Sequence, residues 1–133
     1  MNMEFVTFEI AKKLKEKGFK EQCLAYYTKD SNFYYNSSYG LDVEDAFKSF
    51  NSRPNHICGK RIDTPTISQV LKWLREEKKL HVSIMTFMFK AGWCYEVIRI
   101  GDSPALVASH SNSYNTYEES ALAGIEYVLD NLI

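Results

Sequence analysis

The stretch TPTISQVLKWLREEKKLHVSIMTFMFKAGWCYEVIRIGD (residues 64–102) decides the fold class, because the spacing of its apolar residues changes along it. From Ile67, apolar side chains recur at i+3, i+4 and i+7, which is the spacing of one face of an α-helix. Pro65 suits the first position of a helix, with Thr64 as the N-cap. The first part of the stretch therefore predicts a helix over residues 65–79.

The second part of the stretch has the composition of β-strands. Residues 80–89 and 93–100 are rich in β-branched and aromatic side chains, and the short turn 90–92 between them contains glycine. After a Gly-Asp-Ser-Pro turn, residues 105–111 form a third apolar run. Residues 80–111 therefore predict a three-stranded antiparallel meander.

The N-terminal segment contains the signals of a capped helix. Thr7 is placed as the N-cap, and Gly18 is placed as the first residue beyond the helix. Phe19 then stands where a Schellman ending would pack it back onto Leu14. The expected inward stripe, with Ile10 at its flank, is Phe8, Ala11 and Leu14.

Between the two stretches, aromatic residues and turn formers alternate. The runs 23–28 and 33–38 flank a Lys-Asp-Ser-Asn turn and predict a hairpin. A short helix is expected over residues 42–51, capped by Asp42. The Pro- and Gly-containing stretch 52–65 reads as a connector.

The C-terminal helix has the clearest start in the chain. Thr116 and Glu119 form a capping box, in which each side chain satisfies a backbone N–H at the start of the helix. Gly124 lies in mid-helix, where glycine costs roughly 1 kcal/mol relative to alanine. A close approach of another helix or strand at this position would explain why a glycine is present there. The expected buried face is Ala121, Leu122, Ile125, Val128, Leu129 and Leu132.

Together these elements predict the order α-β-β-(α)-α-β-β-β-α and an α+β fold. We expect an antiparallel sheet, made of the three-stranded meander plus the N-terminal hairpin, covered by two long helices. At this length a single domain over residues 1–133 is the natural expectation.

Composition narrows the functional classes. A net charge of −1 gives no global attraction to nucleic acid or to acidic membranes. No apolar run approaches a membrane span, and the first 19 residues lack the apolar core of a signal peptide. Three widely spaced cysteines do not form a disulfide framework, which favours the cytoplasm.

No constellation for catalysis, for a cofactor or for a metal is recognised. The Cys and His residues lack the paired spacing of a zinc site, and no glycine-rich phosphate loop is present. A Cys94 nucleophile paired with His81 or His110 lacks an activating elbow nearby, so a packed thiol is favoured. Cys23 reads as another packed thiol, and His56 and Cys58 as polar loop residues. We therefore expect a protein that is not an enzyme.

A basic stripe on the helix over residues 65–79 gives one alternative function. Its members, with a tryptophan at the flank, are Lys72, Trp73, Arg75 and Lys79. The αβββα order of residues 65–132 matches double-stranded-RNA-binding domains in topology. However, Glu118 and Glu119 stand where such domains place lysines, so nucleic acid is the less favoured partner.

The aromatic hairpin gives the leading function. Six rings fall within fourteen residues: Tyr26, Tyr27, Phe33, Tyr34, Tyr35 and Tyr39. Because one small core cannot bury both faces of a hairpin, one set of rings should face a partner or water, and which set does so is left open. Tyrosine is enriched at protein interfaces. We expect a protein-interaction domain, in one version a homodimer formed through the aromatic hairpin or a sheet edge.

Two segments resemble a known family. TPTISQVLKWLREEKKLHV (64–82) and YNTYEESALAGIEYVLDNLI (114–133) are similar to small uncharacterised proteins of Bacteroidales bacteria, their phages and their integrated elements. AKKLKEKGF (11–19) also fits the longer members, whereas residues 30–60 fit poorly. The resemblance implies a cytoplasmic accessory protein, in one version of mobile-element origin, and it implies no chemistry.

Overall fold

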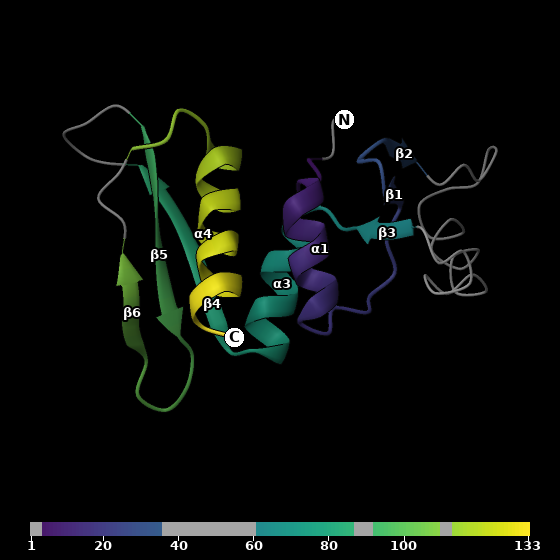
Figure 1. The fold of residues 1–133 in the computed structure, drawn as a ribbon. Helices are drawn as coiled ribbons and strands as arrows, with labels where there is room; N and C mark the ends of the chain where they lie inside the picture. Colours follow the sequence, from purple (N-terminus) through teal and green to yellow (C-terminus); the bar gives the residue numbers. More distant parts are fainter. Residues whose placement is uncertain (1–3, 36–60, 87–91, 110–112) are drawn as a thin grey trace. The chain divides into compact units, whose positions relative to one another are not determined.

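The structure is a computed structural model that describes residues 4–35, 61–86, 92–109 and 113–133. It divides the chain into two compact units, with the boundary between Thr66 and Ile67. Each unit contains helix and a three-stranded antiparallel sheet, which confirms the α+β class (Figure 1). The hairpin and the meander, expected in one sheet, belong to these two separate sheets. The expected single domain over residues 1–133 stays a prediction.

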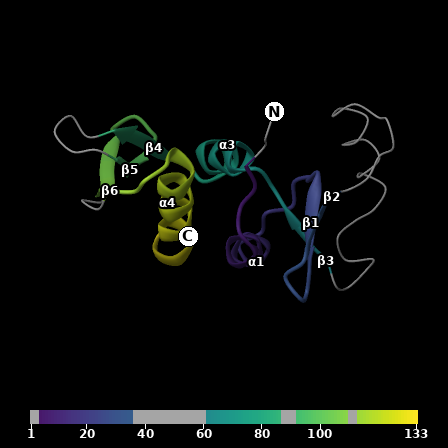
Figure 2. The ribbon, with the colours of Figure 1, turned by 90° about the horizontal axis from the view of Figure 1, so that it is seen from above.

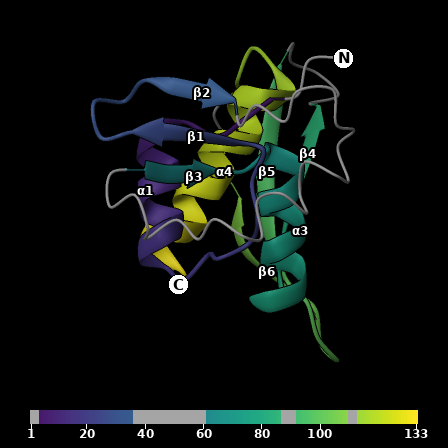
Figure 3. The ribbon, with the colours of Figure 1, turned by 90° about the vertical axis from the view of Figure 1, so that its right-hand side faces the viewer.

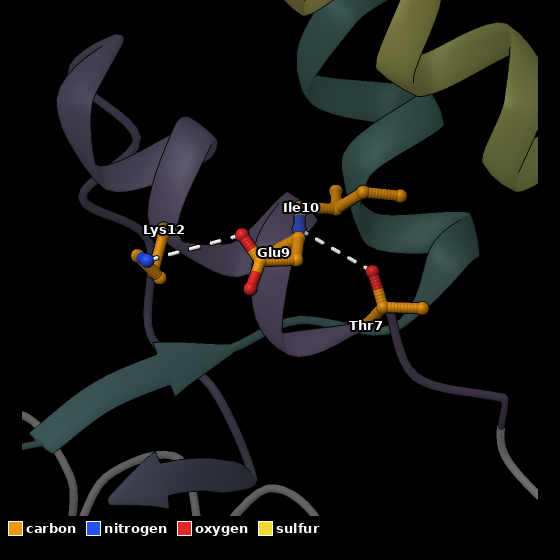
Figure 4. Close-up of polar contacts among 4 residues, drawn as sticks. All are labelled: Thr7, Glu9, Ile10 and Lys12. Carbon is orange, nitrogen blue, oxygen red and sulfur yellow. Dashed lines mark hydrogen bonds and ion pairs between the residues drawn. The ribbon is translucent and has the colours of Figure 1, made fainter. Parts of the chain in front are cut away.

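In the first unit, helix α1 (Phe8–Glu16) begins where the sequence predicts. The side-chain oxygen of Thr7 accepts a hydrogen bond from the backbone N–H of Ile10 at 3.3 Å. Glu9 lies in the first turn and pairs with Lys12 at 3.8 Å (Figure 4). The buried stripe differs slightly from the expected one, because Ile10 is buried whereas Phe8 is half-buried.

Helix α1 ends in the predicted Schellman motif. Gly18 has φ of 91°, a conformation that favours glycine because it lacks a Cβ atom. Its N–H donates to the carbonyl of Lys15 at 3.2 Å, and the N–H of Phe19 donates to the carbonyl of Leu14 at 3.0 Å. The chain therefore reverses at Gly18, and Phe19 becomes buried.

Three strands form the first sheet, in the order β2-β1-β3 (Figure 3). The predicted hairpin is confirmed by β1 (Ala25–Thr28) and β2 (Phe33–Tyr35), which pair antiparallel. Four residues, 29–32, separate the two strands. Because the N–H of Thr28 donates to the carbonyl of Asn32, residues 29–31 form a three-residue loop, with Ser31 at φ of 64°.

Strand β3 (Arg61–Thr64) corrects the last part of the connector predicted over residues 52–65, of which residues 52–60 lie outside the described residues. Its four residues pair antiparallel with β1, from Ala25 opposite Thr64 to Thr28 opposite Arg61. Thr64 is therefore the buried end of a strand and not a helix cap, and its hydroxyl donates to the carbonyl of Val6 at 3.2 Å. The short helix expected over residues 42–51 lies outside the described residues.

The second unit has the predicted αβββα order (Figure 2). Its elements are α3 (Ile67–Glu77), β4 (Leu80–Thr86), β5 (Trp93–Arg99), β6 (Ala105–Ser109) and α4 (Tyr117–Asn131). The strands form the expected antiparallel meander β4-β5-β6. Helix α4 packs on β4 and β5, and α3 packs on β4 and α4.

Helix α3 is shorter than the predicted range of residues 65–79. Residue Lys79 has φ of 56°, so it lies outside the helix and begins the turn into β4. Its carbonyl oxygen accepts a hydrogen bond from the N–H of Ile100 at 2.9 Å. The residue that follows β5 is therefore hydrogen-bonded to the turn between α3 and β4.

Helix α4 has the predicted cap and the predicted close approach at Gly124, but its buried face differs in part. Leu122 and Leu132 are only half-buried, whereas Ser120 and Gly124 are buried. The side-chain oxygen of Thr116 accepts from the N–H of Glu119 at 3.1 Å, which is the first half of a capping box. The carboxylate of Glu119 accepts from the N–H of Asn115 at 3.2 Å. Gly124 is buried against the sheet, where an added Cβ would lie 2.7 Å from Cγ1 of Val82 and 3.1 Å from the ring of Tyr95.

Candidate protein-interaction surface

The register of the hairpin sorts its aromatic residues onto two faces. Tyr26 lies opposite Tyr34, Tyr27 lies opposite Phe33, and Ala25 lies opposite Tyr35. Because alternate residues of a strand point to opposite sides, one face carries Tyr26 and Tyr34, here called the Tyr26 face. The Tyr27 face carries Tyr27, Phe33 and Tyr35. The pairing with β3 adds Arg61 and Asp63 to the Tyr26 face.

The Tyr27 face packs against the N-terminal segment of the same unit. The ring of Tyr27 meets Phe8 and Phe33 edge-on, with centroid distances of 5.5 and 5.4 Å. Its hydroxyl donates to the carbonyl oxygen of Val6 at 3.0 Å. Burial raises the pKa of the Tyr27 phenol. Tyr27 therefore holds the sheet to the segment that leads into α1.

A second aromatic cluster continues this face toward the end of β2. The ring of Phe5 lies 5.3 Å from Phe33 and 5.7 Å from Tyr35, and Phe33 lies 5.0 Å from Tyr35. The edge-on or tilted geometry of these pairs is favourable for aromatic rings. Tyr35 is nevertheless 64% exposed, so the cluster reaches the surface.

The Tyr26 face presents a stacked pair of rings with a cation. The rings of Tyr26 and Tyr34 stack with centroids 5.6 Å apart and planes inclined by 26°. The guanidinium carbon of Arg61 lies 3.9 Å from the centroid of Tyr26, within the range of a cation–π contact. Tyr34 is 48% exposed, so the outer ring of the stack is open on one side.

Asp63 completes the charge balance of the Tyr26 face. Its Oδ1 lies 3.9 Å from a terminal nitrogen of Arg61. Burial raises the pKa of the Asp63 carboxyl, and the positive charges of Arg61 and Lys15 partly offset that rise. Arg61 thus contacts both the carboxylate and the Tyr26 ring, and its side chain is only 16% exposed.

Five of the six predicted interface residues lie in one sheet. Tyr39 lies outside the described residues. The sequence-based prediction missed Phe5, Arg61 and Asp63, which the structure adds to the surface. The sequence gives no sign that Arg61 and Asp63 belong to this surface, because they are distant from the aromatic runs in sequence. They reach the hairpin only through the pairing of β3 with β1.

The predicted nucleic-acid stripe is only partly assembled. Lys72 and Arg75 are exposed on α3, but Lys79 has left the helix. Trp73 is only 5% exposed, and the Lys78 ammonium lies 5.4 Å from its ring centroid. An indole buried to this degree has no free face on which a base could stack.

The cysteine and histidine residues of the described segments do not converge. On β4 and β5, Cys94 lies opposite Met85 whereas His81 lies opposite Ile98, a separation of roughly 13 Å along the strands. Burial raises the pKa of the Cys94 thiol, and of Cys23 more strongly. No group of three potential metal ligands occurs among the described residues. His56, Cys58 and His110 lie outside them.

Within the described segments, no helix has the length and apolar character needed to cross a membrane. No family model, curated protein or solved structure matches the chain. The resemblance of residues 64–82 and 114–133 to the Bacteroidales proteins therefore stays a prediction.

Proposed function

We propose that this chain is a non-enzymatic, intracellular protein-interaction domain, and that the aromatic surface of the first sheet is its contact site. The observation that carries the proposal is the exposure of Tyr34 and Tyr35, at 48% and 64%, on opposite faces of one strand. Tyrosine provides a large apolar area with a polar tip, and it is enriched at interface cores. The widely spaced cysteines support a cytoplasmic location, and the resemblance supports an accessory role in mobile elements.

The surface has the composition of an interaction hot spot. Tyr34 is stacked on Tyr26, and Arg61 lies over the same ring, so these side chains have lost part of their rotational freedom before binding. Hot spots are enriched in tyrosine and arginine, and preorganised groups lose less entropy on binding. A protein partner with an apolar, ring-bearing patch would match the exposed tyrosines, while Arg61 stays paired with Asp63 behind them.

Site-specific photo-crosslinking tests this proposal. A photoreactive phenylalanine analogue at Tyr34 should crosslink one discrete protein in cells that express the chain. The matched control is the same analogue at Tyr117, a 39% exposed tyrosine of the second unit. The purified partner should then bind Tyr34→Ser roughly 30-fold more weakly than wild type, as expected for a hot-spot residue worth about 2 kcal/mol. Equal crosslinking from both positions, or an unchanged affinity, would contradict the proposal.

A nucleic-acid-binding accessory protein is the second candidate, favoured by the αβββα order of the second unit. The charges weigh against it, because Glu118 and Glu119 occupy the first turn of α4. Fluorescence anisotropy with duplex RNA at physiological salt is the test. Submicromolar binding that Lys72→Glu/Arg75→Glu abolishes would place this candidate first.

A further inference from the structure

The strand edges of the two sheets are not equally protected against pairing with another chain. Natural proteins block an edge with bulges, charges or a covering helix. In the second sheet, β6 skips Val107 between Leu106 and Ala108 in its ladder, which is a bulge. The other edge strand of that sheet, β4, has α3 packed beside it (Figure 2).

In the first sheet the two edges differ in charge. Strand β3 carries Arg61 and Asp63, which would place charged groups into any added ladder. Strand β2 carries only aromatic residues, and residues 31–36 contain no charged side chain. Considering residues 4–35, 61–86, 92–109 and 113–133 alone, β2 is therefore the edge strand that has no bulge, no charged residue and no helix packed beside it.

The hydrogen bonds of the hairpin determine which backbone groups of β2 point outward. The N–H of Thr28 donates to the carbonyl of Asn32 at 2.9 Å, so this pair is of the hydrogen-bonded type. Because the two types alternate along an antiparallel ladder, Tyr26 and Tyr34 form the next hydrogen-bonded pair. The N–H and C=O groups of Phe33 and Tyr35 consequently point away from β1, toward the side of β2 on which no described strand pairs.

We propose that a second copy of this chain pairs antiparallel with β2 about a two-fold axis at Tyr34. This inference rests on the proposed function, because it uses the same aromatic surface and names its partner. The axis places Phe33 opposite Tyr35 of the other copy, and their outward backbone groups then exchange hydrogen bonds on both sides of the axis. The uncharged strand meets itself without like-charge repulsion, as an isologous interface requires.

The side chains favour the same register. On the Tyr26 face, the existing stack of Tyr26 and Tyr34 continues into the Tyr34 and Tyr26 rings of the second copy. On the Tyr27 face, the exposed Tyr35 gains the Phe33 ring of the other copy as a cross-strand neighbour. A three-residue strand supplies few backbone bonds, so the rings provide most of the affinity and the dimer dissociates on dilution.

Cysteine crosslinking tests both the pairing and its register. All variants carry Cys58→Ser, so that the introduced cysteine is the reactive one. The two other native cysteines, Cys23 and Cys94, are buried. Tyr34→Cys is expected to form a disulfide-linked dimer under mild oxidation, because the non-hydrogen-bonded pair at the axis has Cα atoms about 4.5 Å apart. Phe33→Cys and Tyr35→Cys should crosslink to each other when mixed, and much less when oxidised separately. Tyr117→Cys is the matched control.

Sedimentation equilibrium supplies the second measurement. The wild type should show a concentration-dependent dimer that Tyr34→Ser weakens about tenfold or more, with circular dichroism confirming that the variant is folded. A wild type that is monomeric at every concentration, or Tyr34→Cys crosslinking no faster than Tyr117→Cys, would overturn the self-pairing. If Tyr34→Ser still lost a separate protein partner in that case, the proposed function would stand without the dimer. If the wild type is monomeric and Tyr34→Ser also binds the separate protein partner as tightly as the wild type does, both proposals fail.

Discussion

The hydroxyl of Tyr27 donates a hydrogen bond to the carbonyl oxygen of Val6 at 3.0 Å, across twenty-one positions of sequence. The same carbonyl accepts from the hydroxyl of Thr64 at 3.2 Å. Val6 thus joins the segment before α1 to both β1 and β3. This double contact makes Tyr27 a structural residue, whereas Tyr34 and Tyr35 on the neighbouring strand remain exposed.

Substitutions at Tyr27 and at Tyr34 should therefore lower the free energy of unfolding by different amounts. Tyr27→Phe should lower the free energy of unfolding by about 1 kcal/mol, because one hydrogen bond is lost while Thr64 still satisfies the carbonyl. Tyr27→Ser should cost about 2 kcal/mol or more, since its contacts with Phe8 and Phe33 disappear. Tyr34→Ser should cost less than about 1 kcal/mol. Urea denaturation measures all three, and equal losses at Tyr27 and Tyr34 would contradict the assignment of the faces.

Gly124→Ala should destabilise the second unit although alanine is the better helix former. The added Cβ would lie 2.7 Å from Cγ1 of Val82, so the helix or the strand must shift. Overpacking of this kind costs about 1–3 kcal/mol, which exceeds the roughly 1 kcal/mol gained in helix propensity. Thermal or chemical unfolding measures the net loss. Adding Val82→Ala should recover part of the loss, and a Gly124→Ala variant more stable than wild type would refute the close approach.

Tyr95 should make the protein less stable in alkali. Burial, together with the nearby Tyr114 and Tyr127, raises the pKa of the Tyr95 phenol from 10.0 to about 12. Its contribution is fully present below pH 10, because both the folded and the unfolded phenol are then protonated. Between pH 10 and about 12 the unfolded state releases its proton first, so stability falls as pH rises. Denaturation across this range should show a smaller loss for Tyr95→Phe than for wild type. Equal losses would contradict the assignment.

The buried cysteines should resist alkylation in the native protein. Burial raises the pKa of both the Cys23 and Cys94 thiols, and only the thiolate is nucleophilic. Labelling with iodoacetamide at neutral pH, followed by mass spectrometry, should modify these two positions only as fast as the protein unfolds. Full labelling of either residue in denaturant is the control. Rapid labelling of native Cys94 would reopen the hypothesis of a nucleophile.

The sequence alone predicts those features that are stabilised by contacts among a few adjacent residues. The caps at Thr7 and Thr116 and the ending at Gly18 depend on hydrogen bonds within one helical turn, so spacing alone predicts them. The meander over β4, β5 and β6 follows from apolar runs separated by turn residues. The need for a close approach at Gly124 could also be inferred, because a mid-helix glycine requires a packing reason.

The tertiary structure decided what depends on residues distant in sequence. Strand β3 exists because residues 61–64 find hydrogen-bond partners on β1, and the short charged run gives no periodic signal of its own. That pairing removes Thr64 from the helix cap and brings Arg61 onto Tyr26. The register of the hairpin, fixed by its three-residue loop, decides which tyrosines pack and which stay exposed. A shift of the register by one residue would exchange the two faces. Composition alone therefore indicated that some aromatic rings must be exposed, whereas only the strand pairing identified which rings these are.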